Sequence, residues 1–200
     1  MTTRTLSLSG ALAGKTMNGR LTRDGTTETN GEATLPPGNA GTLTNATTVT
    51  AASASHDVVT GATVDLYWTG ATPGVRRGMV AGTVAGTTIP VSGGTGDTLP
   101  PGGTAVVIDT QVIIDFDSTA ASLLLVVVAQ QRRASVQFQQ NAGTVILSLD
   151  LGKYGEDGEP FCWASSTWVA SPFGADVGKV AVSNGDSTGS NTVTIGALRT

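Results

Sequence analysis

The chain has 200 residues, of which 39% are hydrophobic and only 13% are charged, against a usual charged share of about a quarter. Its net charge of −4 excludes the clustered cations of a duplex-binding surface, and its single cysteine excludes an intrachain disulfide framework and a thiolate-built zinc site. Glycine (27 residues) and threonine (32 residues) fill almost a third of the chain. Threonine fits pleated strands and glycine fits turns, so we predict an all-β protein.

Residues 1–40 predict an extended N-terminal arm with at most short strands. Glycines recur every four to seven residues from Gly10 to Gly38, which leaves no helical period. The leucines of the arm are too sparse to build a core, so we expect it to pair with the sheet edge of another subunit. The alternative is that the arm folds back on residues 41–200 and caps an edge strand of its own domain.

Residues 41–109 predict a small barrel-like block of short strands. The link Ala85-Gly86 has the size of a hairpin turn, and glycine suits the positive φ that such a turn needs. Residues 93–97, Gly-Gly-Thr-Gly-Asp, predict a loop; they lack the lysine and the following helix of a phosphate-binding loop. The expected strands are Gly41–Ala51, Thr63–Trp68, Gly78–Val84, Thr87–Val91 and Ala105–Asp109.

Residues 110–200 form the more hydrophobic block and predict a β-sandwich, which could also be continuous with the first block as one domain. Leu123–Val128 is apolar on both faces, as in a central strand. A helix across Thr119–Arg133 is the alternative, and the three consecutive valines favour the strand. In Thr144–Leu151 the residues Ile146, Ser148 and Asp150 share one face. The expected strands are Gln111–Phe116, Ser122–Gln130, Ala134–Gln139, Thr144–Leu151, Phe161–Val169, Lys179–Ser183 and Thr192–Leu198.

The sequence holds no constellation typical of an enzyme. His56 is the one histidine and lies beside Asp57; we interpret it as a surface or turn residue, since neighbours on one strand or turn point apart. Cys162 lies between Phe161 and Trp163 and is interpreted as a small buried hydrophobe. We therefore predict no catalytic residues and no cofactor.

Two groups of carboxylates have the composition, although not the spacing, of a calcium site. Glycine-flanked acidic loops are usually solvated turns, and neither group matches the EF-hand spacing, so we predict no metal. The groups are Asp109, Asp115 and Asp117, and Glu156, Asp157 and Glu159.

Arginines supply the only adjacent cationic pairs, and both pairs lie at predicted turns. Such residues are typical of solvated loop tips, and the alternative is ion pairs with the acids of a neighbouring subunit. Together with residues of the arm they form the candidate intersubunit contacts. These are Arg4, Leu6, Leu8, Arg20, Arg23, Arg76, Arg77, Arg132 and Arg133.

Three segments, His56–Trp68, Arg76–Val84 and Gly93–Pro100, resemble a family of small β-rich structural proteins, virion- or tail-associated, of tailed phages and prophages. The resemblance covers residues 42–109, about a third of the chain, and rests on turn and strand residues. It implies a virion or tail component and transfers no functional residues.

We therefore expect a non-enzymatic virion protein that assembles with itself and other virion proteins, as a capsid decoration or accessory shell component or as a tail (tube) component. No membrane contact or sequence-specific nucleic acid is expected. The first fourteen residues lack a signal peptide's apolar core, so synthesis in the host cytoplasm is expected. The alternative is a carbohydrate-binding or adhesive module that uses an exposed Trp68, Trp163 or Trp168.

Overall fold

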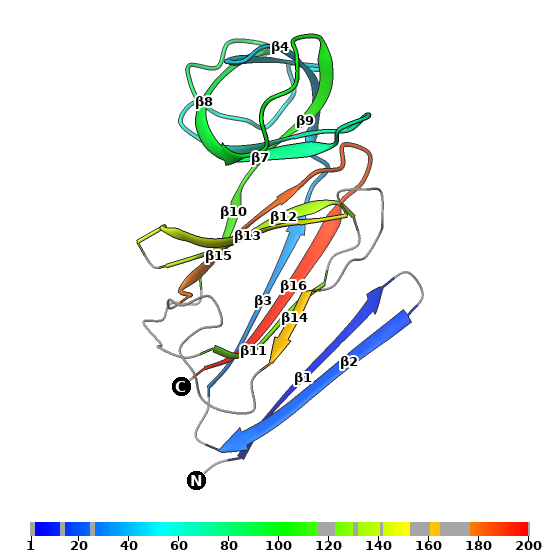
Figure 1. The fold of residues 1–200 in the computed structure, drawn as a ribbon, viewed down its shortest axis with the longest axis vertical. Helices are drawn as coiled ribbons and strands as arrows, with labels where there is room; N and C mark the ends of the chain where they lie inside the picture. The colour runs from blue at the N-terminus through cyan, green and yellow to red at the C-terminus, as the bar shows by residue number, and fades with distance from the viewer. Residues whose placement is uncertain are drawn as a thin grey trace.

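The computed structural model describes residues 3–12, 15–24, 27–115, 123–129, 132–140, 142–152, 161–164 and 177–199. Within these residues every regular element is a β-strand, which confirms the all-β prediction. The strands form a closed barrel, two four-stranded sheets and a separate hairpin. Figure 1 shows the barrel at one end, the two sheets below it and the hairpin at the other end.

The barrel is closed by six strands in the order β4-β5-β8-β7-β6-β9. Its interior is filled by the inward-facing side chains of these strands, including Leu43, Leu66, Met79, Ile89 and Ile108. The barrel therefore has a hydrophobic core of its own. The strands are β4 (Asn39–Asn45), β5 (Thr48–Ala51), β6 (Thr63–Trp68), β7 (Gly74–Ala81), β8 (Thr88–Gly96) and β9 (Thr104–Thr110).

Two sequence predictions for this part of the chain are wrong in detail. The expected single strand Gly41–Ala51 is a hairpin, because the side chain of Asn45 accepts a hydrogen bond from the Thr47 backbone at 2.9 Å and closes a turn. The expected loop at residues 93–97 is largely strand, since β8 continues to Gly96. Gly93 and Gly94 have φ of 73° and 74°, a backbone that only glycine adopts readily.

The other two sheets pack face to face as a sandwich. One has the order β10-β15-β12-β13 and the other β14-β11-β16-β3. Apolar residues from both sheets, among them Val136, Phe138, Val180, Val193 and Ile195, fill the space between them. The strands are β10 (Val112–Asp115), β11 (Leu123–Ala129), β12 (Ala134–Gln139), β13 (Val145–Leu151), β14 (Phe161–Ala164), β15 (Lys179–Asn184) and β16 (Asn191–Arg199) with β3 (Thr27–Leu35).

Several predicted strands are confirmed. The bounds of β6 and β12 are those expected from the sequence, and β11 is a strand where a helix was the alternative. β11 lies between β14 and β16, as expected of a central strand. The expected strand Phe161–Val169 is a strand at residues 161–164, and its remainder lies outside the described residues.

The N-terminal arm differs most from its prediction. Instead of short strands it contains the hairpin β1 (Thr3–Leu12) and β2 (Lys15–Asp24), followed by the long strand β3. β3 pairs antiparallel with β16 over its whole length, from Thr27 opposite Arg199 to Leu35 opposite Asn191. Ala33 and Leu35 are buried in the sandwich core. The alternative interpretation, that the arm folds back and caps an edge strand of its own domain, is therefore right for residues 27–35.

A close approach of backbone to indole makes Gly74 a sensitive position. A Cβ atom at Gly74 would lie 2.2 Å from Cζ2 of Trp68, whose buried indole donates a hydrogen bond to the Thr72 carbonyl at 3.0 Å. We expect Gly74→Ala to lower the free energy of unfolding by about 1–3 kcal/mol, the usual cost of overpacking. Urea denaturation measures the change.

The variant Trp68→Phe, which has a smaller ring, is the control background for this prediction. There the same Gly74→Ala substitution should cost less than in the parent protein, because part of the clash is removed. Strictly additive effects of the two substitutions would show that the clash is not the cause.

Candidate functional site

A buried polar layer joins the barrel to the sandwich. In β12 alternate side chains face opposite sides of the sheet, so Val136 and Phe138 enter the sandwich core while Ser135, Gln137 and Gln139 face the barrel. The polar face of the sheet therefore meets the outside of the barrel wall. We call this contact the junction. It comprises Asp65, Tyr67, Arg77, Asp109, Gln111, Arg133, Ser135, Gln137, Asp150, Ser183 and Asn184.

A chain of hydrogen bonds at the centre of the junction connects β6 to β15. Asp65 and Tyr67 both point out of the barrel, and the Ser183 hydroxyl lies 2.5 Å from each of their side-chain oxygens. The Ser135 backbone amide donates to the Tyr67 hydroxyl at 2.9 Å. Burial is the main cause that raises the pKa of Asp65, and it raises the pKa of Tyr67 well above its usual value. These groups are fully enclosed, so they act on the fold and do not meet a substrate.

Arg133 connects the same two bodies through hydrogen bonds of its guanidinium to carbonyls of the barrel. Its Nε and Nη2 atoms donate to the carboxylate of Asp150 at 3.1 and 2.9 Å, and Nη1 and Nη2 donate to the carbonyls of Trp68 and Gly74 at 2.9 Å. The guanidinium also lies over the ring of Tyr67, 5.1 Å from its centroid. A single side chain of the sandwich is thereby bonded to two strands of the barrel.

Asp109 is the second buried carboxylate of the barrel wall. Its Oδ2 accepts a hydrogen bond from the Asn184 backbone amide at 2.6 Å. Burial raises the pKa of Asp109 to about 7, against the opposing effect of this hydrogen bond. Asn184 in turn donates from Nδ2 to the Pro36 carbonyl at 2.8 Å, which holds the segment between β3 and the barrel.

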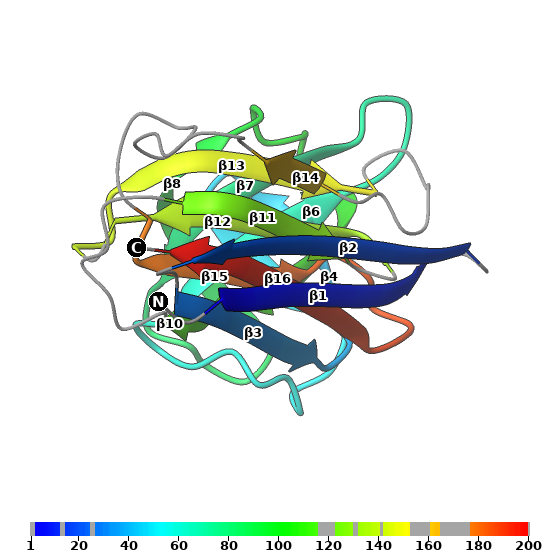
Figure 2. The ribbon, with the colours of Figure 1, turned by 90° about the horizontal axis from the view of Figure 1, so that it is seen from below.

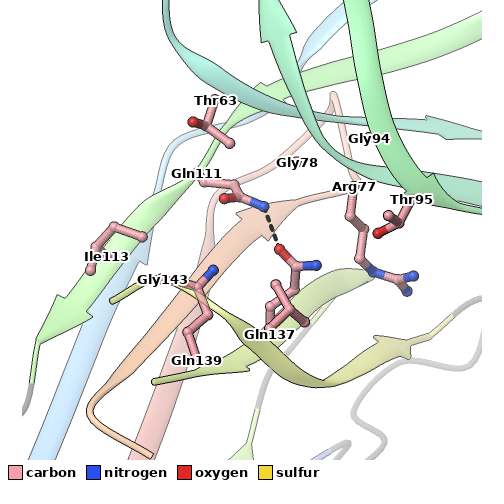
Figure 3. A pocket seen from close by; sticks show the side chains of 11 residues that line it. Thr63, Arg77, Gly78, Gly94, Thr95, Gln111, Ile113, Gln137, Gln139 and Gly143 are labelled. Carbon is pink, nitrogen blue, oxygen red and sulfur yellow. Dashed lines mark hydrogen bonds between the residues drawn. The ribbon is translucent and has the colours of Figure 1, made fainter. Parts of the chain in front are cut away.

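At one side the junction opens into a cavity of about 490 Å³. Strands of the barrel contribute Thr63, Arg77 and Thr95, and strands of the sandwich contribute Gln137 and Gln139. Figure 3 shows Gln111 reaching across this space to Gln137, where its amide donates to Gln137 Oε1 at 2.7 Å. The lining therefore has five uncharged polar side chains and one guanidinium, beside three glycines and two apolar residues.

Arg76 and Arg77 lie inside β7 and not at a turn as predicted, whereas Arg132 and Arg133 lie in the connection between β11 and β12, as predicted. Arg77 and Arg133 are each only 8% exposed and are bonded across the junction within the chain, and a role for them at a neighbouring subunit stays a prediction. Arg76 donates to the carbonyls of Gly93 and Gly94 at 3.0 Å, and Arg132 forms an ion pair with Asp186 at 2.6 Å. The charge of these side chains is used to join elements of the same chain.

The other candidate contacts lie on the hairpin. Arg4 pairs with Arg23 across the two strands, Leu6 with Leu21, and Ser7 with Arg20; Leu8 pairs with Gly19. These are backbone positions, and the role of the side chains of Arg4, Leu6, Leu8, Arg20 and Arg23 stays a prediction.

The structure also shows where the other residues named from the sequence lie. His56 lies in a loop with Nε2 at 2.8 Å from the Gly86 carbonyl, as expected of a turn histidine. Trp68 is 5% exposed, so its expected use as an exposed sugar platform is wrong. Asp115 lies 3.4 Å from Lys179. The side chains of Cys162 and Trp163, together with Asp117, Trp168 and the acidic loop at residues 156–159, lie outside the described part of the structure.

The sequence interpretation missed most of the junction. Asp65, Tyr67, Gln137 and Ser183 are polar residues that alternate with apolar ones inside predicted strands. That alternation is the ordinary signal of a solvated strand face, and it carries no information on whether a second body covers the face. The signal that the sequence does contain is the pattern Ser135-Val136-Gln137-Phe138-Gln139, which indicates two strand faces of different polarity.

Comparisons with known proteins add little. No protein-family model matches the chain, and no curated protein matches it. The chain is similar to a solved structure described as the crystal structure of the STIV MCP, with 6% identity, 100% of this chain and 97% of that chain covered, and a TM-score of 0.25. A likeness of this size carries no argument about function. In the part of the chain that the structure describes, no group of His, Cys, Asp or Glu could hold a metal ion, and no helix could cross a membrane.

Proposed function

We propose that the protein is a non-enzymatic structural component of a tailed-phage virion that assembles with copies of itself and with other virion proteins. The observation that supports this most is the hairpin β1-β2, which is a two-stranded sheet of its own and pairs through hydrogen bonds with no other described strand. β1 lies beside β3, β11 and β16 of its own chain, but a two-stranded sheet without a further strand gains stability when it joins a larger sheet. A neighbouring copy supplies such a sheet.

The outer strands of the β10-β15-β12-β13 sheet support the same proposal. Val112 and Ile113 on β10 and Val145 on β13 are exposed large hydrophobic residues, and both strands have a free side in the described sheet. Edge strands with exposed apolar side chains are templates for another chain. In the proposed assembly the hairpin of one copy extends one of these edges in the next. Figure 2 shows the hairpin reaching past the end of the sandwich.

Deletion of residues 2–24 tests this proposal. The shortened protein should remain folded with nearly unchanged thermal unfolding, because β3 and both cores stay intact. It should sediment as a monomer where the full chain forms oligomers, and it should fail to join particles. Analytical ultracentrifugation and purified virions measure both results.

A longer deletion, of residues 2–35, is the matched comparison. It removes Ala33 and Leu35 from the sandwich core, so it should unfold the sandwich where the shorter deletion does not. A full chain that stays monomeric at micromolar concentration, or a shortened chain that still assembles, would overturn the proposal.

The proposal also assigns the protein a position in the virion particle. An acidic chain with few lysines suits a surface that does not bind DNA, and we favour a decoration or accessory shell protein over a tail tube. Immunogold electron microscopy of intact particles decides this: labelled heads agree with the proposal, and labelled tails contradict it.

A further inference from the structure

We propose that the cavity beside the junction binds a small acidic sugar, with Arg77 on its carboxylate and the glutamine amides on its hydroxyls. The cavity, of about 490 Å³, is within the usual range of ligand sites. It is built by two bodies with separate cores, the barrel and the sandwich. Ile113 and Val145 belong both to its wall and to the sheet edges used in the assembly proposed above.

Arg77 provides the anion-binding group. Its side chain is 8% exposed, and Nε donates to the Ser135 hydroxyl at 2.7 Å. Among the described residues, its two terminal nitrogens meet no acceptor. Asp65 attracts Arg77 electrostatically, but the oxygens of Asp65 are already bonded to Ser183, Gly78 and Gln111. A guanidinium that lines a cavity is matched best by a carboxylate, which accepts two parallel N–H bonds.

Gln139 provides a second unused group. It is also 8% exposed, lines the cavity, and its amide has no hydrogen-bond partner within the described residues. Figure 3 shows its side chain rising from the sheet into the space beside Gln111 and Gln137. Because Gln139 lines the cavity, its amide is open to a ligand there. A ligand group that both donates and accepts hydrogen bonds, such as a hydroxyl, would satisfy it.

Gln111 restricts the ligand further. Both amide hydrogens of Gln111 are used, one on Asp65 Oδ1 at 2.8 Å and the other on Gln137 Oε1 at 2.7 Å. Only its carbonyl oxygen is left, so the ligand must donate at that point. One amide hydrogen of Gln137 is used on the Ser148 hydroxyl at 3.1 Å. The cavity therefore suits a ligand with a carboxylate and with hydroxyls that both donate and accept.

Two exposed apolar residues line the same cavity. Ile113 and Val145 are 47% and 44% exposed and belong to the cavity wall. The C–H face of a pyranose ring would cover these side chains, while its hydroxyls reach the amides. A uronic acid combines the three features: a carboxylate, several hydroxyls and an apolar ring face.

Glucuronate titrated into the full chain tests this site, with isothermal titration calorimetry and saturation-transfer NMR as readouts. We expect one binding site at millimolar or tighter affinity. Glucose, which lacks the carboxylate, and acetate, which lacks the hydroxyls, should each bind at least tenfold more weakly. No binding of glucuronate, or equal binding of acetate, would overturn the proposal.

Variants locate the site. Gln139→Leu should weaken glucuronate binding roughly fivefold, in line with the loss of one hydrogen bond, and Arg77→Gln should weaken it more than tenfold. Gln139→Leu keeps the test valid if Arg77→Gln does not fold, because Gln139 makes no side-chain hydrogen bond to the described fold. Arg132→Gln, at an ion pair outside the cavity, is the control and should bind as the parent does. Undiminished binding by both cavity variants would place the ligand elsewhere and overturn the proposal.

Discussion

Substitution of Arg133 by alanine is expected to lower the free energy of unfolding by about 3–5 kcal/mol, the usual cost of breaking a buried ion pair from one side. Its partner Asp150 has a side chain only 10% exposed, so the variant leaves a nearly buried carboxylate without its cation. The carbonyls of Trp68 and Gly74 also lose their donors. Each unsatisfied buried acceptor adds to the loss.

The shape of the unfolding curve should change as well. The barrel and the sandwich have separate hydrophobic cores, and the junction is what couples them. With Arg133 removed, we expect guanidinium denaturation to separate into two transitions, one for each core. Intrinsic fluorescence and circular dichroism, followed in parallel, detect the separation.

The neighbouring arginine supplies a matched control. Arg132 pairs with Asp186 at a more exposed place, where the two side chains are 40% and 24% accessible. Arg132→Ala should therefore cost less than about 1 kcal/mol and leave a single transition. An equal loss for both variants would show that burial of the Arg133 pair is not the cause.

Acidification should stabilise the protein through Asp109. The pKa of this carboxyl is raised by burial to about 7, so the folded state binds a proton that the unfolded chain, with a pKa near 3.8, does not hold until lower pH. The contribution of Asp109 to stability is therefore lost as the pH rises from about 4 to about 7, and is constant above that. Asp65, whose pKa is also raised by burial, acts in the same direction.

The Asp109→Asn variant measures this effect. Each pKa unit corresponds to about 1.4 kcal/mol, so the charged form of Asp109 costs about 4 kcal/mol above pH 7. An asparagine keeps an oxygen for the Asn184 amide and carries no charge. We expect a higher melting temperature than the parent at pH 8, and a smaller rise in melting temperature between pH 8 and pH 5.

An exposed acid in the same neighbourhood is the control for this titration. Asp57 accepts a hydrogen bond from Asn39 and raises the pKa of Asp109 by its charge. Asp57→Asn should keep the pH dependence and move it to lower pH. If Asp109→Asn has the same pH profile as the parent, another group is responsible.

The sequence by itself determined the strand character of this protein and the bounds of some strands. β-branched residues and glycine punctuation predicted strands at Thr63–Trp68 and Ala134–Gln139 with the observed bounds. The valines at residues 126–128 favoured a strand over a helix, and the structure has a strand there. These features depend on side-chain branching, turn geometry and alternation, which act over a few residues.

Only the tertiary structure decided what covers each strand. β3 was expected in an arm that pairs with another subunit, because its few apolar residues lie far apart. Yet it pairs with β16 of its own chain, about 160 residues later, and Leu35 is fully buried in the sandwich core. Arg77 and Arg133 were expected at turns, in solvent or beside a neighbouring subunit, yet both are buried. Arg133 is surrounded by the carbonyls of Trp68 and Gly74 and by Asp150, and Arg77 is bonded to Ser135. β12 alternates polar and apolar residues as an exposed strand does, whether its polar face is covered or not. Whether such a face meets water, a barrel wall or a ligand depends on contacts between distant segments, and local patterns do not encode those contacts.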